Sequence, residues 1–370
     1  MSISVDSTNK SDASPARSGQ VSGRSRLGQL TGIEIMATGS YVPEAVVANE
    51  DLAELGCDSE WIVQRTGIRQ RRRASPEQAT SDLALRAAEQ CLQRAWVKPP
   101  EVDLIVVATI TPDHATPSTA CHLQRALGCV APAMDVNAAC ADFMYALVTA
   151  GQFVANGSAK YALVVGAEVM SRTVNPADQK TYPLFGDGAG AVLLRGTPKI
   201  APKGLLSYTL GAEGCGGQLL SIPSGGSHSH HYSRSSAGDH YLPWRVRYSN
   251  GPCRVVSDSL QDCLTCARLD IGQINLMILH QANMHNHRLG RVRFCFSRNK
   301  VFVNLERYGN TSASQHPPGS STKRLHQWHS RKPGQLVMLC GFGSGLAWGV
   351  PPSGNSDPSS PCSGQGYESV

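Results

Sequence analysis

The chain turns from strand to helix at Asp135-Val136-Asn137-Ala138-Ala139-Cys140-Ala141-Asp142-Phe143. The apolar residues before Asn137 predict a strand, and the residues from Phe143 onward have helical spacing. Small residues around Cys140 leave room for a substrate, and the unpaired N–H groups at a helix start lower the pKa of a nearby thiol. The stretch therefore predicts a nucleophilic cysteine between a strand and the first turn of a helix.

Strand and helix patterns alternate through residues 31–200. Apolar runs at 33–39, 104–109, 133–137 and 161–166 predict strands, and the spacing at 82–96, 120–127 and 143–156 predicts helices. From about residue 201 the order partly repeats, with a helix pattern at 257–267 and strand patterns at 276–279 and 336–345. This alternation predicts a layered α/β fold, and 370 residues allow two domains or one large duplicated domain.

Two polar signals follow apolar runs in the later part of the chain. Leu276-Met277-Ile278-Leu279 leads into His280-Gln281-Ala282-Asn283, and Arg307-Tyr308-Gly309-Asn310-Thr311-Ser312 comes later. A Cys, a His and an Asn, each at the end of an apolar run, can supply a nucleophile, a base and a polar partner. Taken singly, each of these residues more often serves core packing or a satisfied polar contact.

The composition favours a folded chain outside the membrane. Hydrophobic residues make up 41% of the chain, and no run reaches the roughly 18 apolar residues of a membrane span. Residues 1–29 begin without an apolar segment, so we expect a disordered extension rather than a secretory signal. The net charge of +6 is too small to indicate nucleic acid. We expect a cytoplasmic protein with neither nucleic-acid nor membrane partners.

The cysteines and glycines offer two further readings. The 12 cysteines are scattered, and without an export signal we expect free thiols. Cys263-Leu264-Thr265-Cys266 has the spacing of a redox or metal pair, but no second pair accompanies it, so we expect no metal site. Gly186-Asp187-Gly188-Ala189-Gly190 precedes a strand, whereas a dinucleotide fingerprint follows one. We interpret these glycines as sites of close backbone packing.

Several motifs together resemble the β-ketoacyl-[acyl carrier protein] synthase III family, the condensing enzymes that initiate bacterial fatty-acid synthesis. They are Trp61-Ile62-Val63-Gln64-Arg65-Thr66-Gly67-Ile68, the Cys140 strand, Phe185-Gly186-Asp187-Gly188-Ala189-Gly190, His280-Gln281-Ala282-Asn283, Gly309-Asn310-Thr311-Ser312-Ala313 and Gly341-Phe342-Gly343-Ser344-Gly345. The resemblance implies an α/β thiolase fold, usually as a homodimer. Two similar halves, 30–200 with the cysteine and 201–350 with the His and Asn, would stack as α-β-α-β-α layers.

The resemblance also implies a reaction. Cys140 would attack the thioester of an acyl-CoA, normally acetyl-CoA, and hold the acyl group. Malonyl-[acyl carrier protein] would then lose carbon dioxide while His280 and Asn310 donate hydrogen bonds to the enolate oxygen. Backbone N–H groups of Cys140 and Ser344 would form the oxyanion hole. The CoA thioester is a substrate, and no cofactor is implied.

Binding roles follow from the same resemblance. Trp61 would stack on the CoA adenine, and Arg65 would contact the CoA. Thr116 stands where some relatives carry a bulky aromatic residue that shortens the acyl pocket, which leaves open an acyltransferase of secondary metabolism with another acyl donor. Binding of the acyl carrier protein falls on Gln281, Ala282, Asn283, Met284 and His285.

The chain departs from the family pattern in places. Asp142 replaces a glycine, and a carboxylate there would oppose thiolate formation. Residues 243–253, 285–295 and 315–330 are rich in Arg, His, Ser and Pro and lack helical periodicity. Shifted reading frames of these segments can encode sequence of the family kind, which suggests compensating insertions and deletions, with 351–370 as a disordered tail. An inactive chain with a damaged second half is therefore an alternative.

Overall fold

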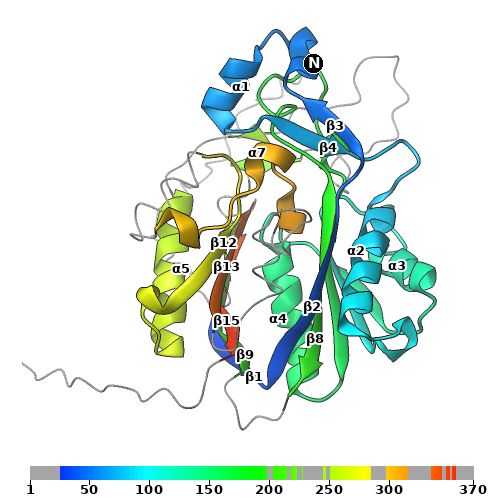
Figure 1. Ribbon diagram of the computed structural model, residues 1–370, viewed down its shortest axis with the longest axis vertical. Helices are drawn as coiled ribbons and strands as arrows, with labels where there is room; N and C mark the ends of the chain where they lie inside the picture. The colour runs from blue at the N-terminus through cyan, green and yellow to red at the C-terminus, as the bar shows by residue number, and fades with distance from the viewer. Residues whose placement is uncertain are drawn as a thin grey trace, which may run out of the picture.

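The computed structural model describes residues 26–197, 203–214, 251–284, 297–315, 335–343, 347–350 and 352–355, with short pieces between 217 and 246. These residues form five layers (Figure 1). Helix α5 (Gly251–Ala267) covers the outer face of one sheet, and α2 (Thr80–Ala95) and α3 (Thr119–Leu127) cover the outer face of another. Helix α4 (Asp142–Ala155) lies between the sheets. This is the α-β-α-β-α stack that the resemblance implies.

The first sheet is formed by the earlier part of the chain. Its order is β2 (Ile33–Tyr41), β8 (Gly188–Gly196), β7 (Tyr161–Glu168), β5 (Leu104–Ala108) and β6 (Ala133–Val136). β5 runs parallel to β6 and β7, while β8 runs antiparallel to β7 and β2. Every residue of β5 is buried, because helices cover both faces of the sheet.

The second sheet repeats this pattern. Its order is β1 (Arg26–Thr31), β9 (Lys203–Ala212), β14 (Ala347–Val350), β13 (Leu336–Gly343) and β12 (Ile274–Leu279), with β15 (Pro352–Asn355) paired to β13 and β9. β12 and β13 are parallel, and β14 is antiparallel to both β13 and β9. The order and directions of β9, β14, β13 and β12 therefore repeat those of β2, β8, β7 and β5, as expected of a duplicated fold, and β1 is an additional strand.

The chain ends differ from the expectation. Arg26–Gln29 was assigned to a disordered extension, yet these residues belong to β1, which pairs antiparallel with β9. Likewise, 352–355 fell in the expected tail and form β15. Both strands depend on backbone pairing with little apolar patterning, and Leu30 is the buried residue of β1. Residues 1–25 and 356–370 lie outside the described residues, and the boundary between halves at 200/201 stays a prediction.

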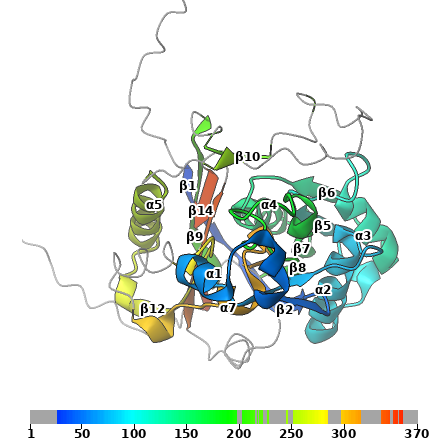
Figure 2. The same ribbon diagram turned by 90° about the horizontal axis from the view of Figure 1, so that it is seen from above.

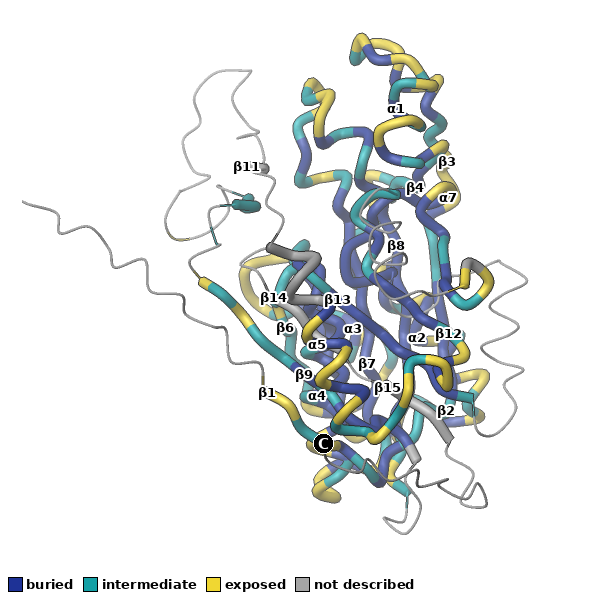
Figure 3. The backbone as a smooth tube through the Cα atoms, turned by 90° about the vertical axis from the view of Figure 1, so that its left-hand side faces the viewer, coloured by how far each residue is buried: buried dark blue, intermediate teal, exposed yellow. Residues whose placement is uncertain are grey.

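Helix α4 forms the centre of the core. Phe143, Met144 and Leu147 are fully buried, and their cluster includes side chains of both sheets. Figure 3 shows the dark buried segments running through the middle of the molecule, where β7 and β8 lie. Because α4 is apolar on most sides, it had to lie inside the molecule rather than on its surface.

A cap of short elements covers one end of the layers. It contains β3 (Ala45–Ala48) paired to β4 (Gln70–Arg73), α1 (Ser59–Thr66) and α7 (Leu305–Tyr308). Seen from above, α1 and α7 lie over the region between the two sheets (Figure 2). β10 (Leu220–Ser221) pairs with β11 (Arg245–Val246).

Two expectations about composition can be compared with the described residues. None of the helices described here has the length and hydropathy required to cross a bilayer. Each cysteine whose side chain is described is a free thiol.

Candidate active site

Cys140 lies in the tight turn between β6 and α4. The residue before it, Ala139, has φ 52°, a left-handed conformation that non-glycine residues rarely adopt. The turn is closed by the Ala141 N–H donating to the Ala138 carbonyl (3.2 Å) and the Asp142 N–H donating to the Ala139 carbonyl (3.0 Å). The strained turn sets Cys140, 6% exposed, immediately before the first turn of α4.

Strand β13 packs backbone to backbone against this turn. A Cβ atom on Gly343 would lie 2.4 Å from the Cys140 backbone nitrogen, and one on Gly341 would lie 3.0 Å from the Ala141 Cα. Only glycine permits this approach, which explains Gly341 and Gly343. The backbone N–H of His280, directly after β12, donates to the Cys340 carbonyl of β13 at 2.7 Å. His280 and the Cys140 turn thus both contact β13, and this one strand lies between them.

Asn310 follows α7 in a loop that requires glycine. Gly309 has φ 67°, and a Cβ atom there would lie 2.9 Å from the Leu184 carbonyl oxygen. The Asn310 N–H donates to the same carbonyl at 2.8 Å, and its side-chain Oδ1 accepts from the Ser312 N–H at 2.9 Å. Since the amide oxygen is engaged, the amide NH2 is the group of Asn310 left to donate.

The loop after α7 also reaches the nucleophile. The hydroxyl of Ser312, two residues beyond Asn310, interacts with the Cys140 thiol and lowers its pKa. His280 therefore follows a strand that pairs with β13, the Cys140 turn packs against β13, and Ser312 connects the Asn310 loop to Cys140. The catalytic roles of these three residues stay a prediction.

The environment of Cys140 opposes ionisation. Burial raises the pKa of the thiol to about 12, Ser312 lowers it, and the charges of Asp142 and Glu168 raise it. This differs from the lowering expected from the helix start, because the thiol is removed from water and two carboxyl groups lie nearby. The thiol is protonated at neutral pH, so its attack on a thioester requires a proton acceptor.

Gln281 has a role that the sequence did not indicate. It is fully buried, and its Oε1 accepts from the backbone N–H groups of Asn304 (3.0 Å) and Leu305 (3.1 Å). Its own N–H donates to Gln315 Oε1 at 2.9 Å, while Gln315 Nε2 donates to the Gln281 and Gly309 carbonyls, each at 3.2 Å. We call this pair the Gln281–Gln315 clamp. It ties the residue after His280 to the residue before Asn310.

The clamp alters one of the predicted binding roles. The Gln281 side chain is enclosed, so it offers no surface to a carrier protein. Ala282, Asn283 and Met284 are partly exposed, and for them this role stays a prediction. His285 and Ser344, the predicted oxyanion-hole partner, lie outside the described residues. Thr116 is exposed in the loop between β5 and α3.

Helix α1 holds Trp61 and Arg65 at the rim of this region. The Arg65 guanidinium lies 4.4 Å from the Trp61 ring centroid, and the Asp58 side chain caps the helix by accepting from the Trp61 N–H at 2.6 Å. A Cβ atom on Gly67 would lie 2.6 Å from the Met284 Cβ. The predicted CoA-binding helix therefore abuts the segment that follows His280.

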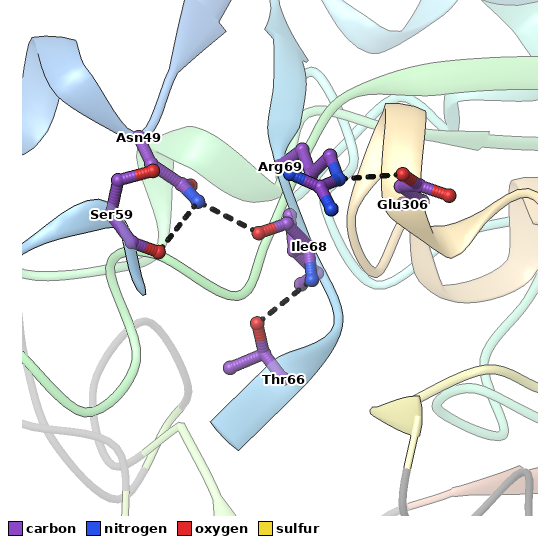
Figure 4. A network of polar contacts seen from close by, with 6 residues as sticks. All are labelled: Asn49, Ser59, Thr66, Ile68, Arg69 and Glu306. Atoms are coloured by element: carbon purple, nitrogen blue, oxygen red, sulfur yellow. Dashed lines mark hydrogen bonds and ion pairs between the residues drawn. The ribbon is translucent and has the colours of Figure 1, made fainter. Parts of the chain in front are cut away.

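Polar contacts fix the end of α1 (Figure 4). Asn49 Nδ2 donates to the Ile68 carbonyl at 2.8 Å, and the Ile68 N–H donates to Thr66 Oγ1 at 3.0 Å. Arg69 Nε pairs with Glu306 of α7 at 2.7 Å. The Arg69–Glu306 contact joins the segment after α1 to α7, the helix that precedes Asn310.

The glycine-rich segment and the Cys263–Cys266 pair lie in the packed framework of the fold. A Cβ atom on Gly186 would lie 2.3 Å from the Tyr308 carbonyl oxygen, so this glycine serves close backbone packing, as interpreted. Cys263 and Cys266 lie in α5. Among the residues described, no group of three or more His, Cys, Asp or Glu side chains is placed to hold a metal ion.

The fold and these residues define a class of protein: a duplicated α/β fold with a cysteine at the start of the central helix. Family descriptions for 3-oxoacyl-[acyl-carrier-protein (ACP)] synthase III match residues 134–214, and for its C-terminal part residues 264–350. The chain is 52% identical over 346 residues to the β-ketoacyl-[acyl-carrier-protein] synthase III of Rhodopirellula baltica, covering 88% of this chain and 99% of that protein. The chain belongs to the 3-oxoacyl-[acyl-carrier-protein] synthase III family.

Solved structures agree with this assignment. The 3-oxoacyl-[acyl-carrier-protein] synthase III of Aquifex aeolicus superposes with a TM-score of 0.75 at 34% identity, covering 87% of this chain and 100% of that one. The priming β-ketosynthase of the R1128 polyketide biosynthetic pathway superposes with a TM-score of 0.77 at 29% identity, covering 90% and 99%. The thiolase-like architecture is thus shared with both.

Proposed function

We propose that this chain condenses an acyl-CoA, normally acetyl-CoA, with malonyl-[acyl carrier protein]. The products are 3-oxoacyl-[acyl carrier protein], CoA and carbon dioxide, and the reaction initiates fatty-acid synthesis. The proposal is supported by the packing of the Cys140 turn against β13, by His280 at the end of the neighbouring β12, and by Ser312, which connects the Asn310 loop to Cys140. Membership of the synthase III family supports the same acyltransferase reaction.

Acylation comes first. The Cys140 sulfur attacks the thioester carbon, and CoA leaves as the acyl group moves to Sγ. The Cys140 backbone N–H, at the start of α4, is the donor we assign to the developing oxyanion; Ser344 is the second donor expected from the family. One such donor is typically worth about 3–4 kcal/mol of transition-state stabilisation.

Decarboxylation follows on the acyl-enzyme. The malonyl group loses carbon dioxide, and negative charge develops on its thioester oxygen. The His280 side chain and the Asn310 amide NH2 donate to that oxygen, and fixed donors of this kind act because they need no reorganisation during the reaction. The resulting carbanion then attacks the carbonyl carbon of the acyl group. The bond from this carbon to the Cys140 sulfur breaks, and the sulfur takes up a proton to become the free thiol.

Binding of the two substrates is assigned to the rim. Trp61 and Arg65 hold the CoA, and Ala282, Asn283 and Met284 meet the carrier protein. No cofactor takes part in this scheme. We assign the reaction to the cytoplasm, where both thioester substrates are made.

A homodimer is part of the proposal. β6 ends the first sheet, and all four of its residues are only partly buried in the single chain. An open edge of this kind is usually covered or paired. Pairing of β6 with β6 of a second copy would cover it and would bring the exposed Thr116 loop of one copy toward the other. Sedimentation at two protein concentrations tests the state directly.

The reaction is tested with purified protein, acetyl-CoA and malonyl-[acyl carrier protein]. Mass spectrometry should detect the 3-oxoacyl product, and Cys140→Ala should abolish it. Asn310→Ala should still take an acetyl group but form product far more slowly. If Cys140→Ala keeps full activity, the proposal is wrong. Longer acyl-CoA donors test the alternative of an acyltransferase of secondary metabolism, which the likeness to the R1128 priming β-ketosynthase keeps open.

A further inference from the structure

Glu168 is a buried acid that the reaction scheme leaves without a task. It ends β7 and is fully buried. Its carboxyl accepts hydrogen bonds from the hydroxyls of Thr111 (2.6 Å) and Thr109 (3.2 Å) and from the Ile110 N–H (3.2 Å). Donors arranged in this way stabilise the ionised form of a carboxyl group that water cannot reach. Glu168 is therefore built to carry a negative charge inside the protein.

Ser312 lies between Glu168 and the nucleophile. It begins the short helix η7 (Ser312–Gln315), which packs on β7 so closely that a Cβ atom on Gly166 would lie 2.9 Å from the Ala313 carbonyl oxygen. The Ser312 hydroxyl lowers the pKa of the Cys140 thiol and that of the Glu168 carboxyl, which places it near both groups without a hydrogen bond of normal geometry to either.

The Ser312 hydroxyl is fully enclosed and held in place. Its backbone has φ 50°, a left-handed conformation unfavourable for serine, and its N–H donates to Asn310 Oδ1 at 2.9 Å. Among the described residues the hydroxyl makes no hydrogen bond of normal geometry in this state. Hydrogen bonds that act in catalysis are often long before the substrate binds and tighten in the complex.

Asp142 is the second carboxyl group beside the nucleophile. It is fully buried, and neither of its oxygens makes a hydrogen bond of normal geometry with a described residue. Burial and the charge of Glu168 raise the pKa of Asp142, while the N–H groups at the start of α4 lower it. Glu168 has more hydrogen-bond donors than Asp142, so the protein stabilises the ionised form of Glu168 better than that of Asp142.

We propose that Glu168 accepts the proton of the Cys140 thiol through the Ser312 hydroxyl when Cys140 is acylated. The inference rests on the proposed nucleophilic role of Cys140. The thiol proton moves to Ser312 Oγ as the Ser312 hydroxyl proton moves to the Glu168 carboxylate. The sulfur electron pair forms the bond to the thioester carbon. When the tetrahedral intermediate collapses, the CoA sulfur takes the bonding pair and recovers the proton by the same route, so CoA leaves as a thiol.

The relay predicts a specific pH dependence. Burial raises the pKa of Glu168 to about 7, against the lowering by its hydrogen bonds. The titratable groups that interact with Glu168 are Cys140 and Asp142, at the start of α4. The base must be ionised to act, so the rate of acylation should rise with pH to a midpoint near 7 and then level off.

The test compares variants in two assays over a pH range of about 5.5 to 9. The first is single-turnover acetylation of Cys140 by acetyl-CoA, followed by intact mass. The second is alkylation of Cys140 by iodoacetamide, which needs no acyl donor. Glu168→Gln and Ser312→Ala should acetylate on the order of 100-fold more slowly at pH 8 and lose the midpoint near 7. Asp187→Asn is the matched control, because Asp187 is equally buried and hydrogen-bonded to Ala74 and Ser171.

The outcomes separate the relay from a structural effect. The control should keep the midpoint, and a similar loss in the control would overturn the inference. So would a Glu168→Gln protein that keeps the midpoint and acetylates within threefold of the unmodified rate. If Glu168→Gln does not fold, Ser312→Ala removes one hydroxyl and makes the same test. An unmodified protein whose alkylation follows the midpoint but which takes no acetyl group would support the relay and contradict the proposed function.

Discussion

The Gln281–Gln315 clamp makes the most definite prediction about the site. The substitution Gln281→Met keeps nearly the same side-chain volume and removes the amide oxygen. In the unmodified protein that oxygen accepts from the backbone N–H groups of Asn304 and Leu305, at 3.0 Å and 3.1 Å. Methionine offers no comparable acceptor, so both N–H groups are left unpaired in a buried setting.

The size of the effect follows from those two groups. An unpaired buried donor costs about 1–3 kcal/mol, so the free energy of unfolding should fall by about 2–6 kcal/mol. Total stability is usually about 5–15 kcal/mol, so the effect is a large share of it. The bonds between Gln315 and the Gln281 backbone remain in this variant, and the lost bonds are those to Asn304 and Leu305 at the start of α7. Because α7 leads into Asn310, the decarboxylation step should slow as well. Gln315 still holds the helix that contains Ser312, so Cys140 should keep its acetylation.

Urea unfolding and intact mass measure the two parts. Gln64→Met is the matched control, since Gln64 is exposed and its side chain contacts Glu60 on the same helix. The control should change stability by less than about 0.5 kcal/mol. A loss of less than 1 kcal/mol in Gln281→Met would refute the reasoning. If instead stability were unchanged and KM for malonyl-[acyl carrier protein] rose, Gln281 would be a carrier contact after all.

Three further predictions concern charges. Asp142→Gly removes a carboxyl group whose ionised form opposes the Cys140 thiolate. At pH values high enough to ionise Asp142, alkylation should therefore speed up about threefold for each unit by which the thiol pKa falls, and an unchanged rate would contradict this. Burial raises the pKa of Glu168 from 4.5 to about 7, so the folded state binds its proton more tightly than the unfolded state. The resulting stabilisation of about 3 kcal/mol is present below pH 4.5 and lost as pH rises through 7, and urea midpoints of Glu168→Gln should lack this slope. The ion pair of Arg69 and Glu306 is 66% and 55% exposed, so a double-mutant cycle should give a coupling energy below about 1 kcal/mol.

The layered fold could be predicted because its central elements have strong patterns. β5 is an uninterrupted apolar run, and α4 is apolar on most sides, so both had to be buried. β1 escaped prediction because it is an edge strand held by backbone pairing to β9, which leaves little trace in the side chains. β15 pairs with both β13 and β9 but has no apolar run, because its sequence is Pro-Ser-Gly-Asn. The predicted helix at 257–267 begins earlier, at Gly251, because a helix can extend through residues without apolar periodicity.

The sequence predicts some residues of the candidate site and misses others. Cys140, His280 and Asn310 could be located because each follows an apolar run and lies in a motif of the family. The buried roles of Gln281 and Glu168 could not be predicted, because a buried polar residue is defined by partners far away in sequence, such as Gln315 for Gln281. The direction of the thiol pKa was also missed, since the sequence shows the helix start but not the burial that outweighs it.

The central claim is that Cys140 receives the acyl group. The direct measurement is the intact mass of the purified protein before and after incubation with acetyl-CoA, with Cys140→Ala in parallel. The mass before incubation also establishes whether residues 243–253, 285–295 and 315–330 are present as written. We expect one acetyl adduct on the unmodified protein and none on Cys140→Ala. An adduct that persists in Cys140→Ala, or a protein of the correct mass that takes no acyl group from acetyl-CoA or longer acyl-CoA donors, would contradict the account.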